Sequence, residues 1–165
     1  MKIEKLITIK QESNMEITGA TLLSSEEYNN YKNRIPHLDK NWWLRSPGYD
    51  DALRAVCVFG DFGFVFNRGD IVYGELGVRP ALQINLSSSN LSVGDEFVIG
   101  EHKFTVISES YAISNSDIGY YPFRKDSKAD NANNYEVSDV KKFVDEWYEE
   151  LIKEHEISKE EEIEI

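Results

Sequence analysis

The side chains that most often do chemistry are few and scattered in this 165-residue chain. The only cysteine, Cys57, lies in an apolar run, which indicates a small core residue rather than a nucleophile. His37, His102 and His155 are far apart and lack the spacing of zinc ligands to one another or to the cysteine. We therefore expect no structural zinc.

Four aspartates lie near predicted turns and offer oxygen atoms to a cation: Asp50, Asp51, Asp61 and Asp70. Calcium-binding loops place such ligands at regular positions and end in a glutamate, and none of these segments has that spacing. We expect no metal and no other cofactor, with a calcium site as the weaker alternative.

Nucleophilic and phosphate-binding motifs are also absent from the sequence. Ser24, Ser25 and Ser46 are explained by a helix cap and a turn, and no Gly-x-Ser-x-Gly motif surrounds them. The segment 60–63 is too short and too acidic to hold a phosphate. The sequence thus predicts no catalytic residues and a protein that is not an enzyme.

The composition is acidic, with a formal net charge of −12 and a pI of about 4.7. Direct binding to a nucleic-acid backbone needs clustered Lys and Arg, so we do not expect it. An acidic surface either provides solubility or imitates the charge of a nucleic acid. No long apolar segment indicates a signal peptide or a membrane span, so we expect a cytoplasmic protein without membrane contact.

The elements that would position a site are short strands and two helices. Ser24 and Glu27 have the spacing of a capping box, which predicts a helix to about residue 33. Phe62, Phe64 and Phe66 alternate, which favours one core-facing side of a strand. The other predicted strands span 52–59, 71–73, 78–86, 96–99, 102–108 and 111–114, and the segment 68–70 is predicted to be a turn.

A second helix is predicted to begin near Ser138, where apolar residues recur every three or four positions. This apolar stripe includes Trp147 and should face the core. The length favours a single domain over residues 1–156, followed by a solvated acidic tail at 157–165.

Two blocks, WWLRSPG at 42–48 and GVRPAL at 77–82, couple large apolar side chains to an arginine. A buried arginine needs carboxylate, carbonyl or ring-face partners to offset its desolvation. We therefore predict a structural brace inside a β-rich core. Its expected members are Trp42, Trp43, Arg45, Arg79 and Trp147.

Together with LLSSEEY at 22–28, these blocks resemble an uncharacterised bacterial and phage family thought to be related to the C-type-lectin and formylglycine-generating-enzyme folds. The resemblance covers residues 22–86. It implies a C-type-lectin-like α+β fold, in which short twisted antiparallel strands carry two helices, and no established catalytic residues. The family's segment similar to 93–151 usually comes first. The halves 1–86 and 91–156, joined by a Ser/Asn-rich connector, therefore resemble a circularly swapped arrangement.

In lectin-like folds, variable strands and loops between such blocks face the partner, which here points to residues 49–73. Aromatic, Arg and Asn side chains are typical of recognition surfaces. The expected contact residues are Tyr49, Arg54, Asn67, Arg68 and Tyr73. We expect a non-enzymatic binding module for a protein partner. The alternative is a phage-encoded, anti-CRISPR-like inhibitor of a host defence nuclease with an acidic, nucleic-acid-mimicking surface, and the oligomeric state stays open.

Overall fold

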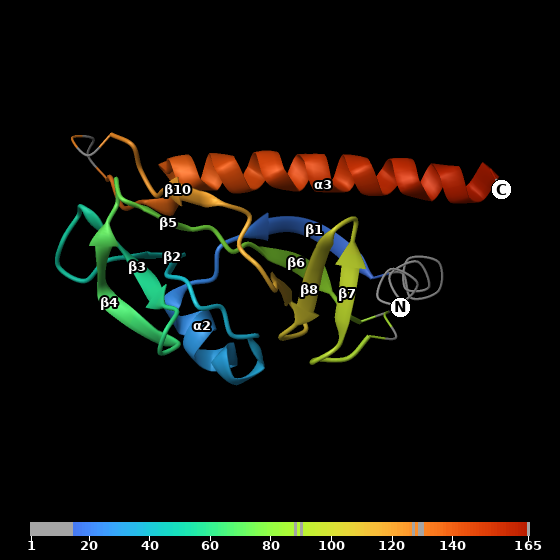
Figure 1. The fold of residues 1–165 in the computed structure, drawn as a ribbon, viewed down its shortest axis with the longest axis horizontal. Helices are drawn as coiled ribbons and strands as arrows, with labels where there is room; N and C mark the ends of the chain where they lie inside the picture. Colours follow the sequence, from blue (N-terminus) through green and yellow to red (C-terminus); the bar gives the residue numbers. More distant parts are fainter. Residues whose placement is uncertain (1–14, 88, 90, 127, 129–130, 165) are drawn as a thin grey trace.

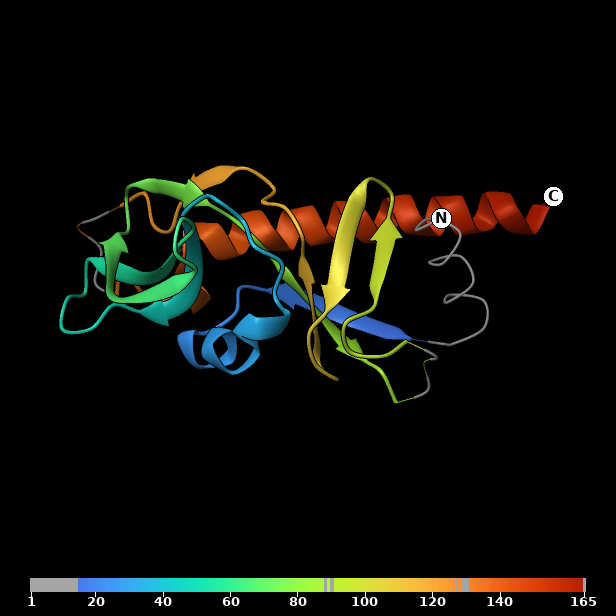
Figure 2. The ribbon, with the colours of Figure 1, turned by 60° about the horizontal axis from the view of Figure 1, so that its bottom comes forward.

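The computed structural model describes residues 15–87, 89, 91–126, 128 and 131–164, with side chains up to residue 154. It is an α+β fold in which two five-stranded sheets lie next to each other along one long helix, α3 (Figure 1). The shorter helix, α2, lies on the opposite side of the molecule from α3 (Figures 1 and 2). The predicted α+β class is confirmed.

The first sheet has the order β1-β6-β9-β8-β7, with every neighbouring pair antiparallel. The strands predicted at 96–99 and 102–108 pair with each other as a hairpin, and they are the last two of this order. The strands are β1 (Glu16–Thr21), β6 (Ala81–Asn85), β7 (Glu96–Ile99), β8 (His102–Val106) and β9 (Tyr111–Ser114). This sheet joins one strand pair from the first part of the chain to three strands from the second part.

The second sheet has the order β10-β5-β2-β3-β4, so β4 is an edge strand. Its strands pair antiparallel except for β2 and β5, which are parallel. The strands are β2 (Trp42–Pro47), β3 (Arg54–Phe59), β4 (Phe64–Ile71), β5 (Glu75–Gly77) and β10 (Tyr120–Pro122). Strand β10 comes from a segment in which the sequence showed no clear periodicity.

The predicted turn at 68–70 is wrong, because these residues lie within β4. Pairing passes from Cys57 opposite Phe66 to Ala55 opposite Asp70, so the extra residues of β4 form a bulge. Gly69 has a φ of 86°, and a Cβ there would lie 2.2 Å from the Ala55 carbonyl oxygen. Glycine thus lets the strand continue where a turn was expected.

Helix α2 (Ser25–Tyr31) begins with the predicted capping box, which is confirmed. The Ser24 hydroxyl accepts a hydrogen bond from the Glu27 amide at 3.0 Å, and the Glu27 carboxylate accepts one from the Ser24 amide at 2.8 Å. A short 3₁₀ helix, η1 (Lys32–Arg34), follows directly. Its following loop forms one side of the site described below.

Helix α3 (Asp139–Glu164) is capped by Ser138, whose hydroxyl accepts a hydrogen bond from the Lys141 amide at 3.0 Å. The segment predicted as a solvated acidic tail, 157–165, is helical as far as residue 164, because α3 continues through it. Glutamate and lysine favour helix and no glycine or proline interrupts the run. Among the described residues, no helix has the length and apolar character needed to cross a membrane.

Three clusters of buried apolar side chains fill the fold, and α3 contacts two of them. Val140 and Val144 pack against the second sheet, with Trp43 at the centre of that cluster. Leu151 packs against the first sheet, beside Phe97 and Phe104. The helix therefore links the two sheets through its apolar stripe. Residues 1–14 and two positions of the connector, 88 and 90, lie outside the described part of the chain.

Candidate ligand pocket and binding face

Three of the five predicted contact residues lie together along the exposed edge of β4. The Tyr49 amide donates a hydrogen bond to the Asn67 carbonyl oxygen at 2.9 Å, which fixes the loop after β2 against β4. Arg68 follows on the same strand, and all three side chains are exposed. We call Tyr49, Asn67 and Arg68 the β4 face.

The other two predicted contact residues do not join the β4 face. The Arg54 guanidinium donates a hydrogen bond to the Gly69 carbonyl oxygen at 2.9 Å and forms an ion pair with Asp51 at 3.3 Å. It thus holds the bulge and the neighbouring loop. Tyr73 is 53% exposed but lies in the turn beyond the end of β4.

The expectation that Phe62 and Phe64 face the core is wrong. They are 76% and 49% exposed, and their rings stack with centroids 5.6 Å apart. Phe62 belongs to the turn between β3 and β4, where the alternation of a strand no longer holds. Only Phe66, stacked on Phe59 at 4.8 Å, packs against the core.

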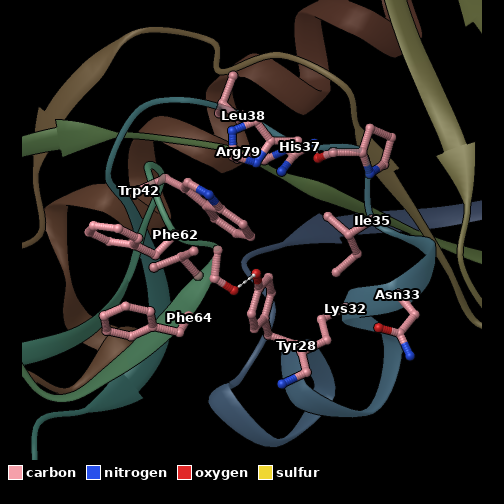
Figure 3. A pocket seen from close by; sticks show the side chains of 13 residues that line it. Tyr28, Lys32, Asn33, Ile35, His37, Leu38, Trp42, Phe62, Phe64 and Arg79 are labelled. Carbon is pink, nitrogen blue, oxygen red and sulfur yellow. Dashed lines mark hydrogen bonds between the residues drawn. The ribbon is translucent and has the colours of Figure 1, made fainter.

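A pocket of about 390 Å³ lies between this hairpin, η1 and the loop after η1 (Figure 3). Trp42 and Phe62 lie on one side of it and Ile35 on the other, while the Tyr28 ring points into it from α2 (Figure 3). The Tyr28 hydroxyl donates a hydrogen bond to the Gly63 carbonyl oxygen at 2.5 Å, so the helix and the hairpin hold each other in place.

Arg79 closes the end of the pocket beside Trp42 and His37 (Figure 3). It is 1% exposed. Its Nε donates a hydrogen bond to the Ser114 carbonyl oxygen at 2.7 Å. Its Nη2 donates to the carbonyl oxygen of Pro36 at 2.6 Å and to that of Asn115 at 3.4 Å. The guanidinium carbon lies 5.0 Å from the centroid of the Trp42 ring, which provides a cation–π contact.

Among the described residues, the Arg79 guanidinium has neither an ion pair with a carboxylate nor an acceptor for its Nη1. No carboxylate of that part of the chain forms an ion pair with it, and its Nη1 has no hydrogen bond there. Burial lowers the pKa of Arg79 to about 10, so the group keeps its charge at neutral pH. A buried cation therefore borders the pocket without an ion pair among the described residues, although Asp117 is near enough to raise its pKa slightly against the effect of burial.

The pocket is lined by basic side chains and by no acidic ones. Lys32 and His37 line it together with Arg79, whereas no Asp or Glu does. This local balance is opposite to the net charge of −12. The pocket can therefore attract an anion that the rest of the surface repels.

Arg45, the arginine of the first block, has a different environment. Its guanidinium forms an ion pair with Glu27 and donates a hydrogen bond to the Leu22 carbonyl oxygen at 2.8 Å. Burial alone would raise the pKa of Glu27. Hydrogen bonds from Arg45, the Ser24 amide and the Tyr111 hydroxyl together lower it by more, so the pKa lies below its usual value. Arg45 is thus a brace between α2 and β2.

The tryptophans expected in the brace lie in or beside the core. Trp42 and Trp43 are fully buried, and the Trp43 Nε1 donates a hydrogen bond to the Tyr121 carbonyl oxygen at 2.9 Å. Trp147 is partly buried between His102 and Phe104, and its buried Nε1 has no hydrogen-bond partner among the described residues.

The described residues contain no cluster of three or more His, Cys, Asp or Glu side chains that could hold a metal ion. Burial raises the pKa of the Cys57 thiol to about 12, which keeps it protonated at neutral pH. His37 lines the pocket while His102 contacts Trp147, so the two do not meet.

The first part of this α+β chain is similar to a family of uncharacterised domains. Residues 8–86 match the family described as "Domain of unknown function (DUF6273)", which places an uncharacterised domain over both arginine blocks. The matched segment ends at β6, before the three strands and the helix that complete the fold. Neither the curated proteins nor the solved structures contain a match.

Sequence reasoning missed the pocket because its residues come from distant segments with different apparent roles. Tyr28 reads as an apolar helix position, Trp42 as core and Arg79 as brace. The only local signals were the Pro36-His37 loop and the glycines that flank Asp61 and Phe62, which mark a turn rather than a strand.

Proposed function

We propose that this chain is a non-enzymatic binding module that recognises a protein partner. The contact surface is the β4 face extended by Phe62 and Phe64. The observation that carries the proposal is the exposed, stacked phenylalanine pair beside an edge strand. Exposed aromatic rings next to Arg and Asn are typical of interface centres.

The backbone of the edge strand adds a second kind of contact. Strand β4 pairs with β3 on one side only, so its other side offers N–H and C=O groups. An extended partner segment can pair with such an edge while pockets between side chains provide specificity. The bulge at Gly69 interrupts this edge, which limits pairing to the part near Phe64 to Arg68.

The finer fold assignment belongs to the same proposal. We assign a C-type-lectin-like fold with circularly swapped halves in a cytoplasmic protein of bacterial or phage origin. Two features support the swap: the first sheet pairs β6 of the first half with β9 of the second, and α3 packs on both sheets. A second half that completes the core of the first is what a permuted order requires.

The test is capture of a partner from nuclease-treated bacterial lysate with the full chain as bait. The double variant Phe62→Ala/Phe64→Ala should lose a protein that the parent captures at both low and high salt. Tyr120→Ala is the matched control, because Tyr120 is an exposed aromatic on β10, at the opposite edge of the same sheet. If the double variant captures the same protein as the parent, the β4 face is not the contact surface.

The second candidate is the acidic inhibitor of a nucleic-acid-handling enzyme. It is favoured by the exposed residues of α3 between 139 and 154, where glutamates outnumber lysines. These residues are Glu146, Glu149, Glu150 and Glu154 against Lys142 and Lys153. This candidate predicts capture of a nuclease only at low salt, because screening weakens attraction between exposed charges. The double phenylalanine variant should not affect such capture.

A further inference from the structure

We propose that the pocket beside Arg79 binds a small organic anion, consisting of a carboxylate on a flat apolar body. The site goes beyond the protein-binding face proposed above and does not depend on it, although Phe62 and Phe64 border both. The proposal rests on three features of the pocket: an unmet donor, the sign of its charges and its aromatic walls.

The unmet donor is the first feature. Arg79 uses Nε and Nη2 on backbone carbonyl oxygens, while Nη1 has no acceptor among the described residues. A guanidinium presents its donors in a planar fork that suits a carboxylate, and Nη1 is the donor that remains available for one. A ligand carboxylate at the end of the pocket would supply an acceptor for Nη1 and a negative charge in direct contact with the guanidinium, closer than that of Asp117.

The charges around the pocket select the same ligand. Lys32 at the rim and His37 near Arg79 add donors, and no carboxylate lines the pocket. Attraction of an anion would therefore meet no repulsion from within the site. A cationic ligand would find no counter-charge there, so the site should discriminate against it.

The walls define the rest of the ligand. Phe62 and Phe64 present exposed ring surface, and Ile35 and Leu38 add aliphatic surface. Trp42 and Tyr28 also line the pocket but are only 1% and 5% exposed (Figure 3). The volume of about 390 Å³ lies in the range of small-molecule sites, which combine apolar walls with a few placed polar groups. Tyr28 and Trp42 already contact each other edge to face at 5.5 Å, so these two walls are preformed.

The experiment titrates the full chain with 2-naphthoate and, separately, with the neutral amide 2-naphthamide and the cation 2-naphthylmethylammonium. Binding is followed by two-dimensional ¹H–¹⁵N NMR, including the indole resonances of the three tryptophans. We expect naphthoate to bind at least tenfold more tightly than naphthamide and to shift the Trp42 indole more than that of Trp147. Equal affinity of the three probes, or shifts centred on Trp147, would overturn the proposal.

Variants then distinguish binding in the pocket from non-specific binding elsewhere on the surface. Arg79→Gln should abolish the preference for naphthoate over naphthamide. If this variant does not fold, substitutions at the exposed residues Lys32 and Phe62 provide the test. Lys32→Gln should weaken naphthoate three- to tenfold without changing naphthamide, and Phe62→Ala should weaken both. Tyr120→Ala is the control and should change neither. Unchanged naphthoate affinity in both Lys32→Gln and Phe62→Ala would show that the anion does not occupy this pocket.

Discussion

The regions around Arg45 and Arg79 have similar sequences and different chemistry. Both arginines follow apolar residues in a short block, and both donate hydrogen bonds to backbone carbonyl oxygens. Arg45 also has the carboxylate of Glu27, which in turn accepts a hydrogen bond from Tyr111 at 2.8 Å. Arg79 is more deeply buried and has a ring face where Arg45 has a carboxylate.

This difference separates a closed site from an open one. At Arg45 the positive charge is neutralised within the fold, so nothing remains for a ligand to supply. At Arg79 the fold provides hydrogen-bond acceptors but no direct ion pair among the described residues, and Arg79 borders a pocket that no Asp or Glu lines. A buried charge is poor evidence of stability by itself, so an incompletely paired arginine beside a cavity is better explained by binding.

The largest expected effect is the loss of Arg79. Arg79→Met should lower the free energy of unfolding by about 2 to 4 kcal/mol, because buried carbonyl oxygens of Ser114 and Pro36 lose their donor. Urea unfolding at pH 7 measures this change, with an unchanged m-value as the sign of an intact two-state transition. A variant as stable as the parent would mean that Arg79 does not brace the fold and is retained for binding alone.

Arg45→Met should have a smaller effect, about 1 to 3 kcal/mol at pH 7, because Glu27 keeps its other hydrogen bonds. Its effect should depend on pH. The pKa of Glu27 is lowered in the folded state, so the stability that this carboxylate provides is complete above about pH 4.5 and is lost as the pH falls through the folded-state value.

The pH series therefore sharpens the comparison of the two regions. As the pH falls below 4.5 and then through the lowered folded-state pKa of Glu27, the stability of Arg45→Met should approach that of the parent, since a protonated Glu27 no longer forms the ion pair. Arg79→Met should not approach the parent, because its acceptors are carbonyl oxygens, which do not titrate in this range. Parallel curves for Arg45→Met and the parent would contradict the role assigned to Glu27.

Tyr111→Phe tests the outer part of the closed site. It removes one hydrogen bond to the Glu27 carboxylate and should cost about 0.5 to 1.5 kcal/mol. It should also raise the pKa of Glu27, which NMR titration of the carboxyl carbon measures. Tyr31→Phe is the control, because the Tyr31 hydroxyl has no hydrogen bond within the described part of the chain; equal losses in the two variants would remove the special role of Tyr111.

Local sequence patterns predicted the elements whose cause is local. The capping box of Ser24 and Glu27, the hairpin of β7 and β8 and the start of α3 at Ser138 depend on residues a few positions apart. The α+β class was implied by the resemblance of the sequence blocks, and these elements agree with it. The bulge at Gly69 was missed because its cause is the carbonyl of Ala55 on the neighbouring strand, which no local pattern reveals.

The candidate site was less accessible to sequence reasoning. The β4 face was predicted in part: Asn67 and Arg68 are neighbours on β4, and Tyr49 joins them from the loop after β2 through its hydrogen bond to Asn67. The pocket joins positions about fifty residues apart, such as Tyr28 and Arg79, so its existence depends on the packing of α2 against the hairpin. That no described carboxylate forms an ion pair with Arg79 is likewise a tertiary fact, because the sequence offers many acidic residues that could have been its partner.

The substitution with the smallest expected effect on stability, Phe62→Ala, distinguishes the open site at Arg79 most clearly from the closed site at Arg45. Phe62 is 76% exposed, so Phe62→Ala should change the free energy of unfolding by less than about 0.5 kcal/mol. The same change should weaken naphthoate, because it removes a ring from one wall of the pocket. Phe62 would then act in binding and not in stability, which is the opposite of Arg45. Calorimetric unfolding together with titration of naphthoate measures both properties on one sample. A loss of 2 kcal/mol or more would place Phe62 in the core after all and would remove the open wall on which the comparison depends.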